Sequence, residues 1–179
     1  MPKEFDGILF AHGKHHDGGL FRPRVAAPAG AAVIAAAAAF VSPWEGMVPV
    51  AYLDRIANPP VWTVCYGETR GVQPGDSYTP SECADMLGER LDEFREGLAE
   101  CIPGVVLQPI GVQVPLISWS YNVGTGAACS STLARLANAD DWRGACNQLP
   151  RWNRAGGVEV LGLTRRRAAE REMCLGALE

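Results

Sequence analysis

The chain has 179 residues and a hydrophobic content of 47%, which is typical of one domain with a single core and a short appendage. Its formal net charge is −4, whereas nucleic-acid binders usually carry a basic face, so we expect no nucleic-acid partner. Its three histidines all precede residue 17, and none of its cysteines forms a Cys-x-x-Cys pair, so the ligand pairs of a zinc site are missing. We therefore expect no metal. We also expect no cofactor and a monomer.

The N-terminal part of the chain differs in composition from the rest. Residues 1–24 are polar, contain glycine and lack apolar periodicity, and we expect a flexible leader. Residues 25–42, the alanine-rich segment, contain no charge, and ten of them are alanine. Arg22 and Arg24 precede this segment, and basic residues before an apolar run favour export of the C-terminal part of a chain. As a helix the segment would be about 27 Å long, barely enough to cross a bilayer.

Three interpretations of the alanine-rich segment remain open. It could be a cleaved signal peptide, because an Ala-x-Ala-like site lies within residues 35–39. It could be a weak, releasable anchor, because alanine gains little from transfer into lipid. It could also be a soluble alanine-rich helix. We favour the releasable anchor, which predicts export to the periplasm with initial tethering to the inner membrane, followed by a separate domain over residues 43–179.

The remainder of the chain predicts a small sheet followed by helices. β-Branched and aromatic residues flank a turn at residues 58–60, which favours a hairpin within residues 46–70. Residues 79–82 read Thr-Pro-Ser-Glu, a capping box that opens a helix ending near residues 103–104. Further helices are expected over residues 112–122, 130–137, 142–149 and 164–175. This order predicts an α+β fold.

Residue types at the expected element ends predict where helices stop and start. We expect Pro43 to end the alanine-rich helix, because proline lacks the backbone donor that a helix interior needs. Asp140, with Asp141 beside it, is expected to cap the helix over residues 142–149, and Thr164 the last helix.

Six cysteines are candidates for disulfide bonds: Cys65, Cys83, Cys101, Cys129, Cys146 and Cys174. Their scatter through a small domain favours an oxidising compartment over buried free thiols. Six cysteines allow many pairings. A bond between Cys83 and Cys101 is excluded, because a straight helix would separate them by about 27 Å.

Three side chains suit the hydrolysis of a glycosidic bond. That reaction needs a protonated carboxyl group for the leaving oxygen and a second carboxylate that guides a water or attacks the sugar. Glu45 stands between Trp44 and Gly46, and apolar surroundings would favour the uncharged form that an acid needs. Asp54 lies nine residues on, and Thr63 a further nine, where its hydroxyl could hold a water beside Asp54.

These residues belong to a longer series of motifs. The series comprises WEG at 44–46, AYLD at 51–54, WTVCYGET at 62–69, SYNVGTG at 120–126, STL at 131–133, GAC at 144–146, RWNRAGG at 151–157 and GLTRRRAAER at 162–171. In this order the motifs resemble the phage lysozyme family, glycoside hydrolase family 24. The resemblance covers about residues 43–176 and, taken jointly, is highly specific.

The resemblance implies a lysozyme-like fold, with a small β-sheet lobe and a larger helical lobe. It implies that Glu45 is the acid and that Asp54 and Thr63 position the nucleophilic water. The implied activity is that of a muramidase, which cuts the β-1,4 bond between N-acetylmuramic acid and N-acetylglucosamine of peptidoglycan. The implied role is host-cell lysis by a phage or prophage endolysin. The alanine-rich segment resembles the signal-arrest-release element of one endolysin subgroup, which first anchors the enzyme and then leaves the bilayer.

Further residues are candidates for substrate binding: Tyr121, Asn122, Arg151 and Arg154. For the first two, sugar binding competes with a role as core aromatic and helix cap. The two arginines could meet carboxylates of peptidoglycan stems. The arginines at residues 165–167 point in different directions around a helix, so we expect some at the surface and some paired with Glu170 or Glu172.

Two positions depart from the family pattern. The spacing between Asp54 and Thr63 is longer than usual, with an insertion around residues 57–60. Glu68 stands where the family often has histidine, at a position that we interpret as structural.

Two other functions are compatible with part of this pattern. A lytic transglycosylase also uses one glutamate, but it forms an anhydro sugar and needs no aspartate to position a water. The combination of Glu45, Asp54 and Thr63 therefore favours hydrolysis. A membrane-tethered protein that only binds the cell wall would not need Glu45 for its function.

Overall fold

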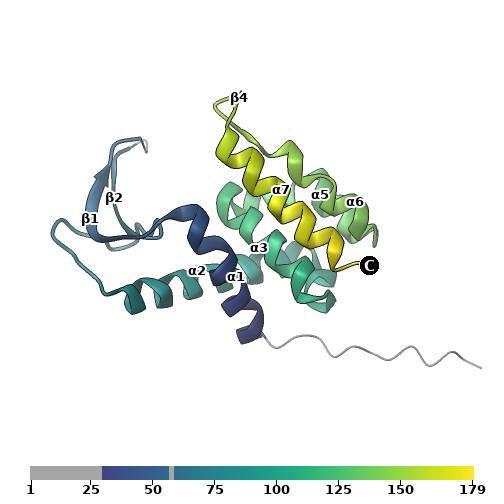
Figure 1. The fold of residues 1–179 in the computed structure, drawn as a ribbon, viewed down its shortest axis with the longest axis horizontal. Coiled ribbons are helices and arrows are strands. Elements are labelled where there is room, and N and C mark those ends of the chain that lie inside the picture. The colour runs from purple at the N-terminus through teal and green to yellow at the C-terminus, as the bar shows by residue number, and fades with distance from the viewer. Residues whose placement is uncertain (1–29, 57–58) are drawn as a thin grey trace, which may run out of the picture.

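The computed structural model describes residues 30–56 and 59–179. The expected leader, residues 25–29 of the alanine-rich segment, and residues 57–58 lie outside the described residues. The elements are α1 (Gly30–Glu45), β1 (Val48–Asp54), β2 (Val61–Cys65), α2 (Pro80–Cys101), the 3-10 helix η1 (Pro103–Leu107), α3 (Ile110–Val123), α4 (Thr125–Cys129), α5 (Thr132–Asn138), α6 (Trp142–Cys146), the 3-10 helix η2 (Leu149–Arg151), β3 (Arg154–Ala155), β4 (Val158–Glu159) and α7 (Leu161–Gly176). The α+β prediction is confirmed, with the β1–β2 hairpin set apart from a larger helical body (Figure 1).

The hairpin forms where the sequence predicts it. Strands β1 and β2 are antiparallel, with Tyr52 opposite Thr63 and Asp54 opposite Val61. The register shifts between Val48 and Tyr52, so the ribbon is irregular near its start. An irregularity of this kind bends a strand and increases its twist.

Helix α2 begins with the predicted capping box. The backbone N–H of Glu82 donates to the hydroxyl of Thr79 at 3.3 Å, and the backbone N–H of Thr79 donates to the carboxylate of Glu82 at 2.7 Å. Both groups are donors that the first helical turn leaves unpaired. The helix turns Leu91 and Leu98 into the core, where both side chains are completely buried.

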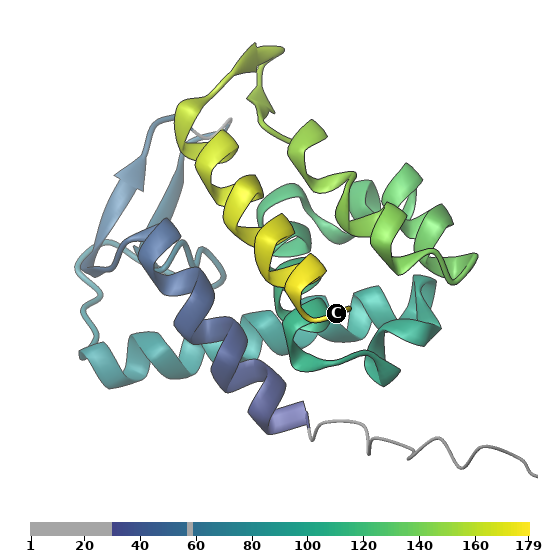
Figure 2. The same cartoon turned by 45° about the vertical axis from the view of Figure 1, so that its right-hand side comes forward.

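Helix α1 contains most of the alanine-rich segment and runs beyond it. Pro43 does not end this helix, contrary to expectation, because proline removes one backbone donor and the helix is already near its end. Val33, Ala37 and Val41 are buried where α1 packs against α2 and α3, and Figure 2 shows α1 crossing α2. Across residues 30–56 and 59–179, no helix is both long and apolar enough to span a membrane.

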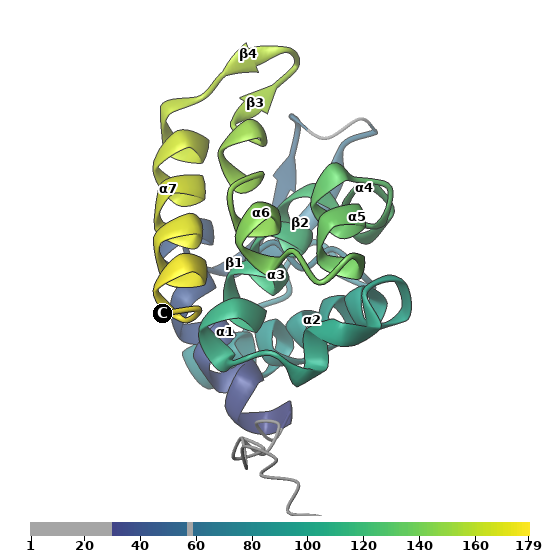
Figure 3. The same cartoon turned by 90° about the vertical axis from the view of Figure 1, so that its right-hand side faces the viewer.

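Helix α3 forms the centre of the helical body. It packs against α1, α2 and α7, which explains why its side chains are buried on nearly every face. Trp119 of α3 is completely buried and meets Trp152 edge to face, with ring centroids 5.3 Å apart. In Figure 3 the short β3–β4 hairpin projects beyond the first turn of α7.

Two features of the last helices bear on the predicted caps. Asp141, and not the expected Asp140, caps α6 by accepting from the backbone N–H of Gly144 at 2.8 Å. The carboxylate of Asp140 instead accepts from the indole N–H of Trp142 at 2.7 Å. Thr164 does not cap α7, contrary to expectation. The helix already begins at Leu161, and the Thr164 hydroxyl donates back to the carbonyl of Val160 at 3.2 Å. A threonine can make such a bond within a helix, so its presence alone does not mark a helix start.

The helices between α3 and α7 differ from the predicted ones in number and in bounds. Helix α4 was not predicted, and α5 begins at Thr132 instead of residue 130. The helix expected over residues 142–149 consists of α6 followed by the separate 3-10 helix η2.

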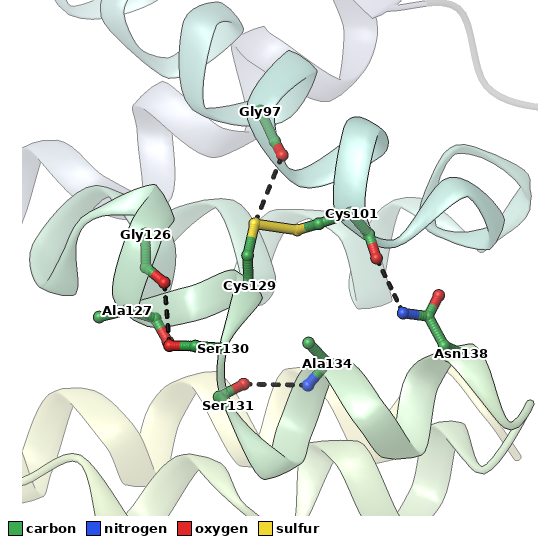
Figure 4. The surroundings of a disulfide bond; sticks show 9 residues. All are labelled: Gly97, Cys101, Gly126, Ala127, Cys129, Ser130, Ser131, Ala134 and Asn138. Carbon is green, nitrogen blue, oxygen red and sulfur yellow. Dashed lines mark hydrogen bonds between the residues drawn. A yellow bond between two sulfur atoms is a disulfide. The ribbon is translucent and has the colours of Figure 1, made fainter.

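The structure pairs all six cysteines, each of which lies among the described residues. The bonds are Cys65–Cys83, Cys101–Cys129 and Cys146–Cys174, with Cα–Cα distances of 5.0, 5.7 and 5.8 Å. They connect β2 to α2, α2 to α4, and α6 to α7. Figure 4 shows Cys101–Cys129, beside which the Asn138 amide donates to the Cys101 carbonyl at 2.8 Å.

Candidate active site

Glu45 is the last residue of α1, at the point where the chain turns toward the hairpin. Gly46 has φ of +71°, a conformation that glycine adopts without strain, and it redirects the chain into β1. The Glu45 side chain is 22% exposed. The apolar side chains on either side of it in the sequence, Trp44 and Met47, are each 38% exposed.

Arg166 of α7 provides the principal contact of this carboxyl group. Its Nη1 donates to Oε1 of Glu45 at 2.6 Å, and its side chain is only 4% exposed. A hydrogen bond between a guanidinium and a carboxylate is among the strongest in proteins. Glu45 therefore has a charged partner, whereas the sequence predicted an apolar setting. The local sequence could not show this, because the partner lies 121 residues away along the chain.

Sequence reasoning expected surface arginines and local ion pairs at residues 165–167. Arg165 is exposed, and both Arg166 and Arg167 pair with Glu170, in agreement with that expectation. The sequence did not predict that Arg166 also binds Glu45. The available signal was the spacing between residues 166 and 170, which places both on one helix face, but it does not point to α1.

The two carboxylate oxygens of Glu45 differ in their contact with Arg166. Oε1 accepts from Arg166, whereas Oε2 takes no part in that bond.

Asp54 and Thr63 are brought together by the hairpin. Because Thr63 lies opposite Tyr52, and side chains two residues apart share a face, Asp54 and Thr63 are diagonal neighbours on one face of the ribbon. The Thr63 side chain is buried, and its hydroxyl donates to the Val61 carbonyl at 3.3 Å. One carboxylate oxygen of Asp54 accepts from the backbone N–H of Ile56 at 2.8 Å, which orients it at the end of β1.

Tyr121 of α3 links the helical body to the hairpin region. Its hydroxyl donates to the Tyr66 carbonyl at 2.8 Å, and its ring meets Phe94 edge to face. Burial raises the pKa of Tyr121 to about 12, and the negative charge of Glu45 acts in the same direction. These contacts favour the structural interpretation of Tyr121 over sugar binding, whereas the neighbouring Asn122 is exposed.

Arg151 and Arg154 make local contacts and remain exposed. Arg151, on η2, donates to the Gln148 side chain at 3.0 Å and lines an open hollow of about 420 Å³ together with Trp152. Arg154, on β3, donates to the Gly157 carbonyl at 3.4 Å. Both guanidinium groups are therefore available to an acidic ligand.

Glu68 has the contacts of a structural residue. Its carboxylate accepts from the backbone N–H groups of Thr69 and Arg70 at 2.9 and 2.8 Å. It also pairs with the guanidinium groups of Arg70 and Arg90. Burial opposes ionisation here, but the hydrogen bonds from Arg70 and Thr69 outweigh it and lower the pKa of Glu68.

A glutamate at a helix end, an aspartate and a threonine on a short ribbon, and a larger helical body define a lysozyme-like protein. Residues 42–170 match the family described as Phage lysozyme, and the chain belongs to this family. Two relatives are named SAR-endolysin. The one from Enterobacteria phage PA-2 is 39% identical and the one from Enterobacteria phage P21 is 38% identical; each alignment covers 86% of this chain and 94% of the relative. The solved active form of the P1 phage endolysin Lyz has a TM-score of 0.69 at 23% identity, covers 85% of this chain and 96% of that one, and shows the common fold.

Proposed function

We propose that the chain is a muramidase that cuts the β-1,4 bond between N-acetylmuramic acid and N-acetylglucosamine, and that it acts as an endolysin in host-cell lysis. The observation that carries this proposal is the position of the Glu45 carboxyl group. Arg166 binds it at 2.6 Å, at the point where α1 turns toward the hairpin that holds Asp54 and Thr63. Membership of the phage lysozyme family supports the same activity.

In the proposed reaction Glu45 donates the proton on Oε2 to the leaving glycosidic oxygen as the bond to the anomeric carbon breaks. Asp54 and Thr63 hold a water on the opposite face of the sugar. The water oxygen attacks the anomeric carbon while Asp54 accepts its proton, and Asp54 later releases that proton to solvent while solvent returns one to Glu45. This route inverts the configuration at the anomeric carbon.

We also propose contacts for the rest of the substrate. The exposed cations Arg151 and Arg154 suit the carboxylates of the peptide stems, and Asn122 could donate to a sugar hydroxyl. Tyr121 would then act by supporting the site from behind, through its bond to Tyr66.

Replacing Glu45 with glutamine tests the assignment. The amide keeps the size of the side chain but cannot donate the proton, so hydrolysis should fall by roughly 10²- to 10⁴-fold or more. A turbidity assay on cells stripped of their outer membrane measures this loss, with the exposed Glu172→Gln on α7 as a matched control. Activity close to wild type in the Glu45 variant would exclude the acid role.

The products separate hydrolysis from transglycosylation. Mass spectrometry of the released muropeptides should find reducing ends, formed by addition of water. Anhydro ends would show that the water-guiding role given to Asp54 and Thr63 is wrong.

We further propose that a phage or prophage encodes the chain, that it is exported to the host periplasm, and that residues 25–42 first tether it to the inner membrane. The names of its SAR-endolysin relatives and the two arginines before the segment support this. Val33, Ala37 and Val41 of the same segment are buried against α2 and α3 in the folded protein. The helical body therefore offers these residues a second apolar environment once they leave the bilayer.

A further inference from the structure

A cluster of buried charges lies behind Glu45, between α3 and α7. The side chains of Arg167 and Glu170 are completely buried, and that of Arg166 is 4% exposed. Together with Glu45 they comprise two cations and two potential anions. Removing such groups from water is costly unless each is paired, so their arrangement is tightly constrained.

The guanidinium of Arg166 is held on the sides that do not face Glu45. Its Nε lies 3.3 Å from both Glu170 Oε1 and the Ser118 hydroxyl. Its Nη2 donates to the backbone carbonyl and the hydroxyl of Ser118, at 3.2 Å each. Because the guanidinium is a planar, rigid fork, fixing Nε and Nη2 also fixes the direction of Nη1, which binds Glu45.

Glu170 and Ser118 are bound to each other as well. The Ser118 hydroxyl donates to Glu170 Oε1 at 2.7 Å, and Arg167 meets both oxygens of Glu170 at 2.9 Å. Burial lowers the pKa of Arg167 to about 10, while the negative charge of Glu170 opposes that change. Arg167 thus balances the charge of Glu170 without contacting Glu45, and Arg166 is the member that joins the cluster to the acid.

We propose that Glu170 and Ser118 are positioning residues of the reaction: they act through Arg166 to orient the carboxyl group of Glu45. This inference rests on the proposed muramidase function. Neither residue would touch the glycan, so their loss should lower kcat and leave KM unchanged, because an acid that is misoriented by a small amount slows the chemical step.

Two serines on α3 provide a matched test. Ser118 and Ser120 are both completely buried, but the Ser120 hydroxyl has no hydrogen-bond partner among the described residues. Ser118→Ala should lower kcat roughly five- to tenfold, the equivalent of about one hydrogen bond, at unchanged KM. Ser120→Ala should leave kcat unchanged. Equal kcat in the two variants would overturn the proposal.

Glu170→Gln should have a larger effect, a loss in kcat of roughly 10²-fold, because two buried guanidinium groups would share a neutral partner. Its thermal unfolding has to be followed in parallel. If this variant does not fold, the comparison of the two serines still decides the matter.

A readout without turnover separates this proposal from the muramidase assignment. In protein carrying carboxyl-labelled glutamate, Ser118→Ala should shift the NMR signal of Glu45, and Ser120→Ala should not. An inactive wild type with this shift would reject the muramidase activity alone. An unmoved Glu45 signal in Ser118→Ala would reject the positioning role, whatever the activity.

Discussion

Leucines on the exposed face of α1 should hold the enzyme in the membrane and delay lysis. Ala31, Ala35 and Ala39 lie four residues apart and are exposed in the folded protein. Ala31 and Ala35 border an open groove of about 760 Å³ between α1 and α2, so leucines there have room. Ala37 is completely buried, and a leucine at that position would overpack the core. The exposed set therefore changes the affinity for lipid without changing the folded enzyme.

The size of the effect depends on the carbon atoms added. Each exchange of alanine for leucine adds three carbons, worth about 0.8 kcal/mol each on transfer from water, or about 7 kcal/mol for three exchanges. Insertion scales value a leucine at only about 0.3–0.6 kcal/mol, which sets a lower bound near 1 kcal/mol. The ratio of membrane-bound to released enzyme should thus rise between roughly fivefold and 10⁵-fold.

Fractionation of cells at intervals after induction measures this ratio, and culture turbidity reports lysis. Glutamine at the same three positions is the matched control and should speed release. The purified leucine variant should retain the kcat of the wild type. A leucine variant that fractionates as soluble protein and lyses cells on the wild-type schedule would refute the anchor, leaving a cleaved signal peptide or a soluble helix.

Other variants test the site and the fold. Asp54→Asn should lower kcat by about 10²-fold or more at unchanged melting temperature, and near-normal kcat would exclude a role in guiding water. Replacing Cys146 and Cys174 with serine opens a loop of 28 residues and should lower the free energy of unfolding by about 3.5 kcal/mol, measured by denaturant titration; equal midpoints in the two proteins would contradict this. Tyr121, whose pKa is raised to about 12, contributes stability that is complete below about pH 10 and is lost as the pH rises toward 12. Tyr121→Phe should therefore show a shallower alkaline loss of stability, and an unchanged slope would argue against the buried phenol as its source.

The parts of the fold that the sequence predicts correctly depend on local signals. The capping box at Thr79 and Glu82 lies within four residues, and the hairpin around residues 58–60 needs only a turn between two β-prone runs. These local preferences do not depend on tertiary contacts, and the packing of the folded protein does not override them. Where the same residue type serves two local purposes, the prediction fails, as at Thr164, whose hydroxyl bonds within α7 instead of capping it.

Local sequence signals could not predict which cysteines pair or that Glu45 binds Arg166. Cys146 and Cys174 meet because α6 packs against α7, and cysteine spacing does not contain that information. Three consecutive arginines look alike in sequence, yet Arg165 is exposed while Arg166 is buried beside α3. Only the packing of α7 decides which of them reaches α1.

The arrangement of α1 has a consequence for control of the proposed activity. Residues 30–42 of the alanine-rich segment and Glu45 belong to one continuous helix, since Pro43 does not interrupt it. Arg166, by contrast, is held by Ser118 and Glu170, which belong to the helical body. A state in which α1 lies in a bilayer and away from α3 would therefore leave the arginine in its place but remove the acid from it. We infer that docking of α1 both buries Val33, Ala37 and Val41 and completes the pair of Glu45 with Arg166. On the proposed membrane tether, release from the bilayer and assembly of the site are then one structural event.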